Sequence, residues 1–168
     1  GIHFALEKGA EYVFLLNQDA WPEKGCIEHM IEVQQKHPEF GVLSPIQLDA
    51  SGKEIDWGFS ILLNYKENPK MFSDLILERN QLDSVYELSK TYAASWLMSR
   101  ECLEKVGGFD PIFFMYGEDN NYCQRVIYHG FKNGIVSNSF LRHDRKDRYT
   151  DEKKNAHKIG TELDRKSV

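Results

Sequence analysis

The sequence predicts an α/β fold in which buried strands alternate with helices. Two short apolar runs, residues 12–16 and 41–46, are bounded by polar residues, and such runs are typical of strands that are buried on both faces of a sheet. Apolar residues at helical spacing come before each run, over residues 2–8 and 23–36. This alternation indicates a mixed or parallel sheet flanked by helices.

The remaining segments continue the same pattern. Residues 49–53 have the composition of a turn, and the two glycines after residue 106 are expected to end a helix. The sequence predicts helices over 71–82, 100–106 and 117–129, and strands over 84–89, 91–98 and 131–137.

The composition is that of an ordinary globular protein. The 168 residues, with a mass of 19.6 kDa, correspond to about one domain. Hydrophobic residues make up 41% of the chain and the net charge is −5, a balance that argues against general disorder and against a general nucleic-acid binder. No apolar stretch approaches the roughly 20 residues that span a bilayer. The three cysteines follow no spacing of disulfides or zinc ligands, which favours free thiols and a cytoplasmic location.

The chain changes character at residue 144. Residues 144–168 contain eight Lys and Arg against six Asp and Glu, a net charge of +2, so that residues 1–143 carry −5 − 2 = −7. We expect residues 1–143 to form the folded domain and residues 144–168 to form a polar, mildly basic tail that is helical or partly disordered. Such a tail is a candidate for contact with the inner face of a membrane. Because residues 2–8 resemble a helix without a strand before it, we expect the chain to be an internal fragment of a longer protein.

Asp19 and His143 are candidate metal ligands. A polar cluster, Asn17 to Asp19, directly follows the first predicted strand, and α/β sheets bind ligands beyond the carboxyl ends of their strands. A carboxylate there can hold Mg²⁺ together with substrate phosphates, or it can simply form an Asx turn. His143 follows a later strand, and its imidazole can bind a metal or be an ordinary surface or core residue.

Glu118 and Asp119 lie in the first turn of the helix predicted over 117–129. Acids in this position are stabilised by the helix dipole and by free N–H groups, so capping is the simpler role. An apolar wall that excludes water would instead raise the pKa of a carboxylate toward that of a general base. Asp119 lies one turn before Cys123, and we expect it to face inward. The residues directly before these acids are apolar: Phe113, Phe114, Met115 and Tyr116.

Several of these segments occur in a characteristic order: residues 15–19, 44–45, 105–110 and 113–119, Arg125, residues 130–131 and His143. In this order they resemble the family 2 glycosyltransferases, and especially the rhamnosyltransferase-like branch. The similarity extends from about residue 2 to residue 143. Its most specific part is the block from the double glycine to the Glu-Asp pair.

The resemblance implies a GT-A fold with a mixed, mostly parallel sheet flanked by helices, lacking here the first nucleotide-binding strands. It implies inverting transfer of a sugar from a nucleotide-diphosphate donor to a saccharide or lipid-linked saccharide acceptor, in polysaccharide or glycoconjugate synthesis. Carried over by position, Asp19 binds a divalent cation (Mg²⁺ or Mn²⁺) and through it the donor, His143 is a later metal ligand, and Asp119 is the catalytic base. Asn17 stands where the metal-binding motif has its first acid.

Other interpretations remain open. Because the donor pocket would be incomplete, we expect the isolated chain to have little or no transferase activity, and we expect an exposed sheet edge to pair with another copy. A GT-A-like nucleotidyltransferase would normally show a glycine-rich, basic phosphate loop. A non-catalytic carbohydrate-binding or scaffold module would use aromatic residues such as Trp57 and Phe113. Trp96, on a predicted strand, is expected to lie in the core.

Overall fold

The computed structural model describes residues 1–77, 82–113 and 116–145, which form six helices and six strands. The helices are α1 (Ile2–Glu7), α2 (Cys26–Lys36), α3 (Trp57–Ser60), α4 (Pro69–Leu77), α5 (Arg100–Val106) and α6 (Glu118–Tyr128). The strands are β1 (Tyr12–Leu16), β2 (Ala20–Pro22), β3 (Phe40–Asp49), β4 (Val85–Leu88), β5 (Ser95–Ser99) and β6 (Lys132–His143).

The strands form one mixed sheet. Their order is β1-β5-β3-β6-β2, and β4 pairs with β6 outside this path. β3 and β6 are parallel, whereas the pairs β1–β5, β3–β5, β2–β6 and β4–β6 are antiparallel. The sheet is therefore mixed rather than mostly parallel, which corrects the expectation from the sequence. The apolar pattern of a strand shows that the strand is buried, but it does not show which neighbour the strand pairs with or in which direction.

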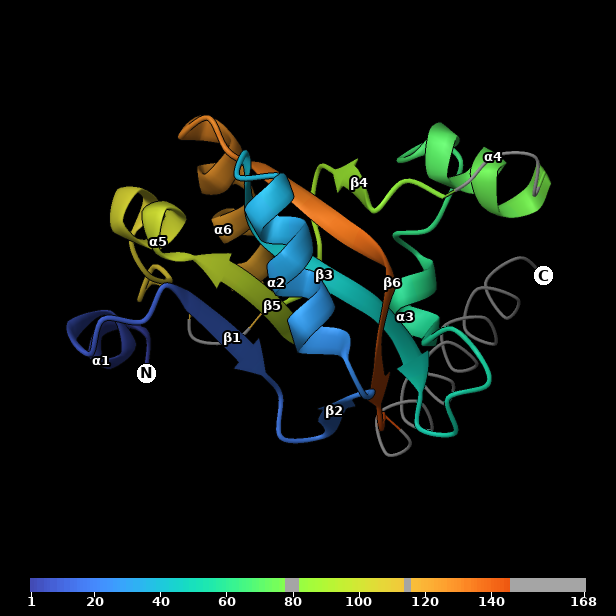
Figure 1. Ribbon diagram of the computed structural model, residues 1–168, viewed down its shortest axis with the longest axis horizontal. Helices are drawn as coiled ribbons and strands as arrows, with labels where there is room; N and C mark the ends of the chain where they lie inside the picture. Colours follow the sequence, from blue (N-terminus) through green and yellow to red (C-terminus); the bar gives the residue numbers. More distant parts are fainter. Residues whose placement is uncertain (78–81, 114–115, 146–168) are drawn as a thin grey trace, which may run out of the picture.

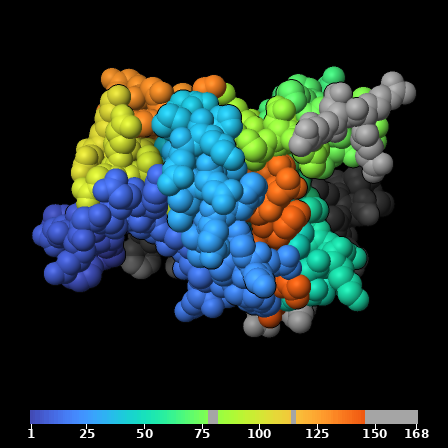
Figure 2. Space-filling view, viewed as in Figure 1, coloured from blue at the N-terminus to red at the C-terminus, as the bar shows by residue number. Residues whose placement is uncertain are grey.

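Helices cover both faces of the sheet (Figure 1). Leu43 and Leu97 face α2, whereas their neighbours Val42 and Met98 face α5 and α6, as the alternation of side chains along a strand requires. In the space-filling view, α2 covers the middle of the near face (Figure 2). A third apolar cluster joins α3 and α4 to β4 and β6.

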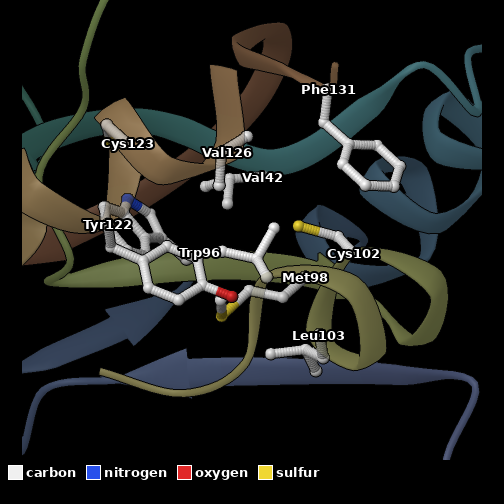
Figure 3. Close-up of a cluster of buried hydrophobic side chains, with 10 residues drawn as sticks. Val42, Trp96, Met98, Cys102, Leu103, Tyr122, Cys123, Val126 and Phe131 are labelled. Carbon is white, nitrogen blue, oxygen red and sulfur yellow. The ribbon is translucent and has the colours of Figure 1, made fainter. Parts of the chain in front are cut away.

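The largest apolar cluster lies between the sheet and the α5–α6 side (Figure 3). Trp96 is fully buried in it, as the sequence predicts, and its ring stacks on Phe109 with centroids 6.0 Å apart. Tyr122 lies beside both rings, and its hydroxyl donates a hydrogen bond to the backbone carbonyl of Gly107 at 2.9 Å. These contacts fix α6, which carries Asp119, against the sheet.

The predicted elements differ from the observed ones mainly at their ends. β2 has only three residues and was not predicted, β5 begins at Ser95 rather than at residue 91, and β6 continues to His143 past an irregularity in its pairing with β3. Of the tail predicted from residue 144, residues 146–168 lie outside the described residues. No helix in the described ranges is long and apolar enough to cross a membrane.

Candidate functional site

The candidate site lies at the end of the sheet where the carboxyl ends of three strands lie. β3 and β6 are parallel, and β1 and β3 are each antiparallel to β5, so β1, β3 and β6 all run in the same direction. β5 begins at this edge, where Ser95 lies opposite Leu16. The carboxyl ends of β1, β3 and β6 therefore meet where α/β sheets place their ligands.

Asp19 and His143 lie together at this edge, although they are far apart in the sequence. The short strand β2 pairs with the end of β6 so that Ala20 lies opposite His143, and the N–H of Asp144 donates to the carbonyl of Asp19 at 2.8 Å. The carboxylate oxygen Oδ1 of Asp19 is 3.3 Å from the imidazole Nε2 of His143. The His143 side chain is fully buried, whereas that of Asp19 is 26% exposed, and the two contacting atoms, Oδ1 and Nε2, are themselves buried.

Arg145 and Asp56 extend this pair into a polar chain. The guanidinium Nε of Arg145 donates to Nδ1 of His143 at 3.1 Å and lies 3.4 Å from the buried Asp56 carboxylate. Asp56 also caps α3, because its Oδ1 accepts the N–H of Phe59 at 2.8 Å. An added Cβ at Gly58 would lie 2.6 Å from Arg145, so Gly58 leaves room for the guanidinium. Neither Arg145 nor Asp56 is a candidate site residue by its sequence pattern.

The Asp19–His143 pair has a spacing that suits a divalent cation. Two neighbouring ligands, each about 2.1 Å from an octahedral ion, are about 3.0 Å apart, and the observed separation is 3.3 Å. A carboxylate oxygen is a ligand for either Mn²⁺ or Mg²⁺, whereas an imidazole nitrogen suits a transition-metal ion better than Mg²⁺. Within residues 1–77, 82–113 and 116–145, however, no three His, Cys, Asp or Glu side chains are grouped to hold an ion. This pair could therefore supply only part of a coordination shell.

Arg145 places a condition on cation binding by His143. Arginine only donates hydrogen bonds, so Nδ1 of His143 acts as the acceptor in the observed contact. The proton of a neutral imidazole is then on Nε2, the nitrogen that faces Asp19. A cation at Nε2 would require this proton to move to Nδ1, and Arg145 would then need a different acceptor.

Asp119 lies in the first turn of α6, as predicted, and is half-buried. Burial raises the pKa of its carboxyl group, and the neighbouring Glu118 acts in the same direction, whereas the N–H of Asn120 and the charge of Lys90 oppose the shift. The Asn120 N–H donates to Asp119 Oδ1 at 2.7 Å. The raised pKa is the direction that a general base requires, since it increases the basicity of the carboxylate.

The residues before Asp119 only partly form the predicted apolar wall. Phe113 packs against Gly117, where an added Cβ would lie 3.3 Å from the Phe113 ring. Tyr116 is 76% exposed and therefore does not shield the acid; Phe114 and Met115 lie outside the described residues. Tyr116 has a backbone φ of 66°, an uncommon conformation for a residue other than glycine.

The structure does not bring Asp119 into a described contact with Asp19 or His143. α6 packs on the face of the sheet opposite α2, whereas Asp19 follows the end of β1. The segment before β5 touches both regions: Thr91 contacts Cys123 of α6, and the carbonyl of Ala94 accepts the N–H of Asn17 at 2.9 Å. The convergence of Asp119 and Asp19 on one substrate stays a prediction.

Two further polar side chains, not predicted from the sequence, lie near this end of the sheet. Gln47 on β3 is fully buried, and its amide oxygen and nitrogen both lack a hydrogen-bond partner among the described residues. Its register partner is Leu141, two residues before His143, so Gln47 and His143 lie on the same face of the sheet. Ser95 is likewise buried, with no described partner for its hydroxyl. A glutamine within a largely apolar strand was the available sequence signal.

Comparison with known proteins supports the fold. No protein-family model matches the chain, and no curated protein matches it. Among solved structures, it is similar to GalNAc-T7 with UDP, GalNAc and Mn²⁺, with a TM-score of 0.59 and 16% identity, over 86% of this chain and 30% of that chain. The fold is GT-A-like. A second structure, A197 from STIV, has a TM-score of 0.49 and 15% identity, over 84% of this chain and 62% of that chain.

Proposed function

We propose that the chain is part of an inverting, metal-dependent glycosyltransferase that moves a sugar from a nucleotide-diphosphate donor to an acceptor hydroxyl. The observation that carries this proposal is the 3.3 Å contact of Asp19 with His143 at the carboxyl edge of a GT-A-like sheet. GalNAc-T7, which shares the fold, was crystallised with UDP, GalNAc and Mn²⁺. The order of the sequence motifs favours family 2, its rhamnosyltransferase-like branch, and a role in polysaccharide or glycoconjugate synthesis.

Asp19 and His143 would hold the divalent cation, and phosphate oxygens of the donor would complete the shell, as is usual where a protein offers few ligands. When bound, the cation neutralises the negative charge that accumulates on the departing diphosphate. His143 is held in place by the pairing of β6 with β3 and β2, and Asp19 by the pairing of β2 with β6. Both ligands are therefore oriented before a donor arrives.

Asp119 would act as the general base. Burial raises the pKa of its carboxyl group, which makes the carboxylate more basic. The carboxylate can therefore take a proton from an acceptor hydroxyl as that hydroxyl attacks the sugar. Such a base contributes roughly 10²–10⁴-fold in rate. Attack from the face opposite the leaving group inverts the configuration at the anomeric carbon.

Cation binding tests this proposal directly. We expect Mn²⁺ to bind the wild-type chain in electron paramagnetic resonance titrations, more tightly when UDP is present. Asp19→Asn and His143→Gln should each weaken binding by about tenfold or more, in line with the loss of one ligand. Asp49→Asn is the matched control. Asp49 ends β3, the strand next to β6, but its carboxylate accepts a hydrogen bond from the Ser51 hydroxyl. Equal Mn²⁺ affinity in all four proteins would refute the metal site.

A carbohydrate-binding module is the alternative that a specific observation favours. Trp57, which directly follows Asp56 in the chain, is 54% exposed, and exposed aromatic residues are common in carbohydrate-binding sites. In the full-length protein, Asp119→Asn separates the two functions: a general base predicts loss of sugar transfer with donor binding nearly unchanged, whereas a binding module predicts unchanged sugar affinity. Release of pyrophosphate rather than a nucleoside diphosphate would instead identify a nucleotidyltransferase. A cytoplasmic location is part of the same proposal.

A further inference from the structure

Gln47 is a fully buried glutamine near the carboxyl end of β3. Its side-chain oxygen and nitrogen both lack a hydrogen-bond partner among the described residues. An amide that leaves water without finding new partners destabilises a fold. A buried amide of this kind therefore needs an explanation, and a bound ion or an ordered water is the usual one.

The backbone of Gln47 is fixed on both sides, which defines the face of the sheet that its side chain occupies. On one side Gln47 pairs with Leu141 of β6, and on the other its carbonyl accepts the N–H of Asp56 at 2.9 Å. The flanking residues Ile46 and Leu48 pack in the cluster that joins α3 and α4 to the sheet. Because side chains alternate along a strand, Gln47 faces the opposite side, which α2 covers (Figure 1).

His143 lies on the same face, one strand away. It follows Leu141 by two residues on β6, and its own register partner is Asp49. Gln47 and His143 are therefore diagonal neighbours, one strand across at about 4.8 Å and two residues along at about 3.3 Å each, which places their Cα atoms about 8 Å apart. Long side chains reach across a diagonal of this length. The spacing allows one ion to contact both residues.

The Asp19–His143 pair needs further ligands to hold a cation. The separation of its two atoms suits a divalent ion, but two ligands fill only part of an octahedral shell. No third His, Cys, Asp or Glu joins the pair in the described ranges. A carbonyl oxygen is another ligand that Mn²⁺ accepts. The Gln47 amide supplies such an oxygen, and this oxygen has no competing hydrogen bond among the described residues.

We propose that Oε1 of Gln47 is a third protein ligand of the divalent cation held by Asp19 and His143. This inference rests on the cation site of the proposed function and adds to it an amide from β3. One carboxylate and two neutral ligands leave the bound ion with a net positive charge, which favours binding of a donor diphosphate. The unpaired amide thus gains a partner when the ion binds.

Electron paramagnetic resonance titrations of Mn²⁺ into the wild-type chain and two variants test this role. Gln47→Met keeps the length of the side chain but removes the amide, so it should weaken Mn²⁺ binding by about tenfold or more. Gln47→Glu replaces a neutral oxygen ligand by a charged one. Since affinity follows the charge of the ligands, this variant should bind Mn²⁺ about tenfold more tightly than the wild type.

Gln34→Met is the matched control. Gln34 is also a buried glutamine, but its amide nitrogen donates to the carbonyl of Phe40 at 2.6 Å, at the start of β3 and away from the site. Gln34→Met should therefore lower Tm and leave the Mn²⁺ affinity unchanged. Without metal, Gln47→Met should have a Tm equal to or above the wild-type value, because it removes a buried amide that has no described partner. Saturating Mn²⁺ should raise the Tm of the wild type more than that of Gln47→Met.

The outcomes separate this inference from the proposed function. Mn²⁺ binding that Asp19→Asn weakens and Gln47→Met does not would refute the role of Gln47 and leave the Asp19–His143 site standing. A wild-type chain that binds no Mn²⁺ would refute both. A metal-free Gln47→Met that is less stable than the wild type would show that the amide serves the fold, through an ordered water, and would also overturn the inference. Circular dichroism shows whether each variant has folded, and Gln47→Met decides the question even if Gln47→Glu does not fold.

Discussion

Replacing Asp56 by Ala should destabilise the protein and loosen the candidate site together. The Asp56 carboxylate has two functions in the structure: one oxygen caps α3 by accepting the N–H of Phe59, and the other lies 3.4 Å from Arg145. Its side chain is 5% exposed, whereas that of Arg145 is 28% exposed. Arg145 in turn donates to His143. Asp56 therefore connects a helix cap, a partly buried ion pair and a proposed metal ligand.

The expected loss can be divided between these two functions. A helix N-cap contributes about 1 kcal/mol. An ion pair with one buried partner contributes about 1–2 kcal/mol, between the values for surface pairs and for fully buried pairs. Asp56→Ala should therefore lower the free energy of unfolding by about 2–3 kcal/mol. For a chain of this length this corresponds to a fall in Tm of roughly 5–10 °C.

Urea and thermal unfolding, followed by circular dichroism, measure these effects. Asp56→Asn keeps an N-cap acceptor but removes the charge, so it should lose only the ion-pair part, about 1–2 kcal/mol. The double variant Asp56→Asn/Arg145→Gln should lose less free energy of unfolding than the two single variants lose in sum. Asp110→Ala is the control, since Asp110 is an exposed acid that accepts only a local N–H. Equal stability of the Ala and Asn variants would refute the helix cap, and strict additivity would refute the ion pair.

Three further predictions follow from the burial of particular groups. Asp119→Asn should stabilise the protein at pH 7, because the raised pKa means that the ionised carboxylate opposes folding. The gain in urea midpoint should vanish at acidic pH, where Asp119 is itself neutral. Glu118→Gln should give a smaller gain, because the Glu118 charge contributes less to the shift than burial does. Gly134→Ala should cost about 1–3 kcal/mol, because its Cβ would lie 2.7 Å from Phe40 and Val85; Gly108→Ala, with open space around it, should be nearly neutral in the same urea assay. Burial raises the pKa of the three thiols from 9.0 to about 11 or 12. The folded state therefore holds these protons more tightly, and the free energy of unfolding should fall as pH rises above 9.0; iodoacetamide at pH 8 should label the thiols only as fast as the protein unfolds.

The sequence predicted those parts of the fold that depend on local pattern. Continuous apolar runs located β1 and β3, and the helix end before Gly107 was placed correctly. β2 was missed because three residues that end in proline carry no periodicity. The direction of β5 was missed because pairing is decided by contacts between segments that are distant along the chain. The same reason explains why a mostly parallel sheet was expected and a mixed one was found.

The residues of the candidate site likewise divide into those that local pattern predicted and those that it did not. Asp19 and His143 were identified as residues of a suitable chemical type at strand ends, and the structure brings them together. Arg145 was assigned to the basic tail, because charge counting does not distinguish a solvated arginine from one that is bound to a buried carboxylate. Asp56 stood in a segment without clear pattern, so its burial could not be anticipated.

The position of Asp19 also explains why its substitution should affect binding more than folding. The contact between Asp19 and His143 exists because the three residues of β2 pair with the end of β6, at the margin of the sheet. Two clusters of buried apolar side chains that stabilise the fold lie on the central strands and on α2, α5 and α6. Loss of a ligand at the margin removes little buried apolar surface, and stability scales with that surface. Asp19→Asn should therefore have a free energy of unfolding within about 0.5 kcal/mol of the wild-type value. An Asp19→Asn variant that unfolded as readily as a core variant would show that the pair maintains the fold rather than binds a ligand.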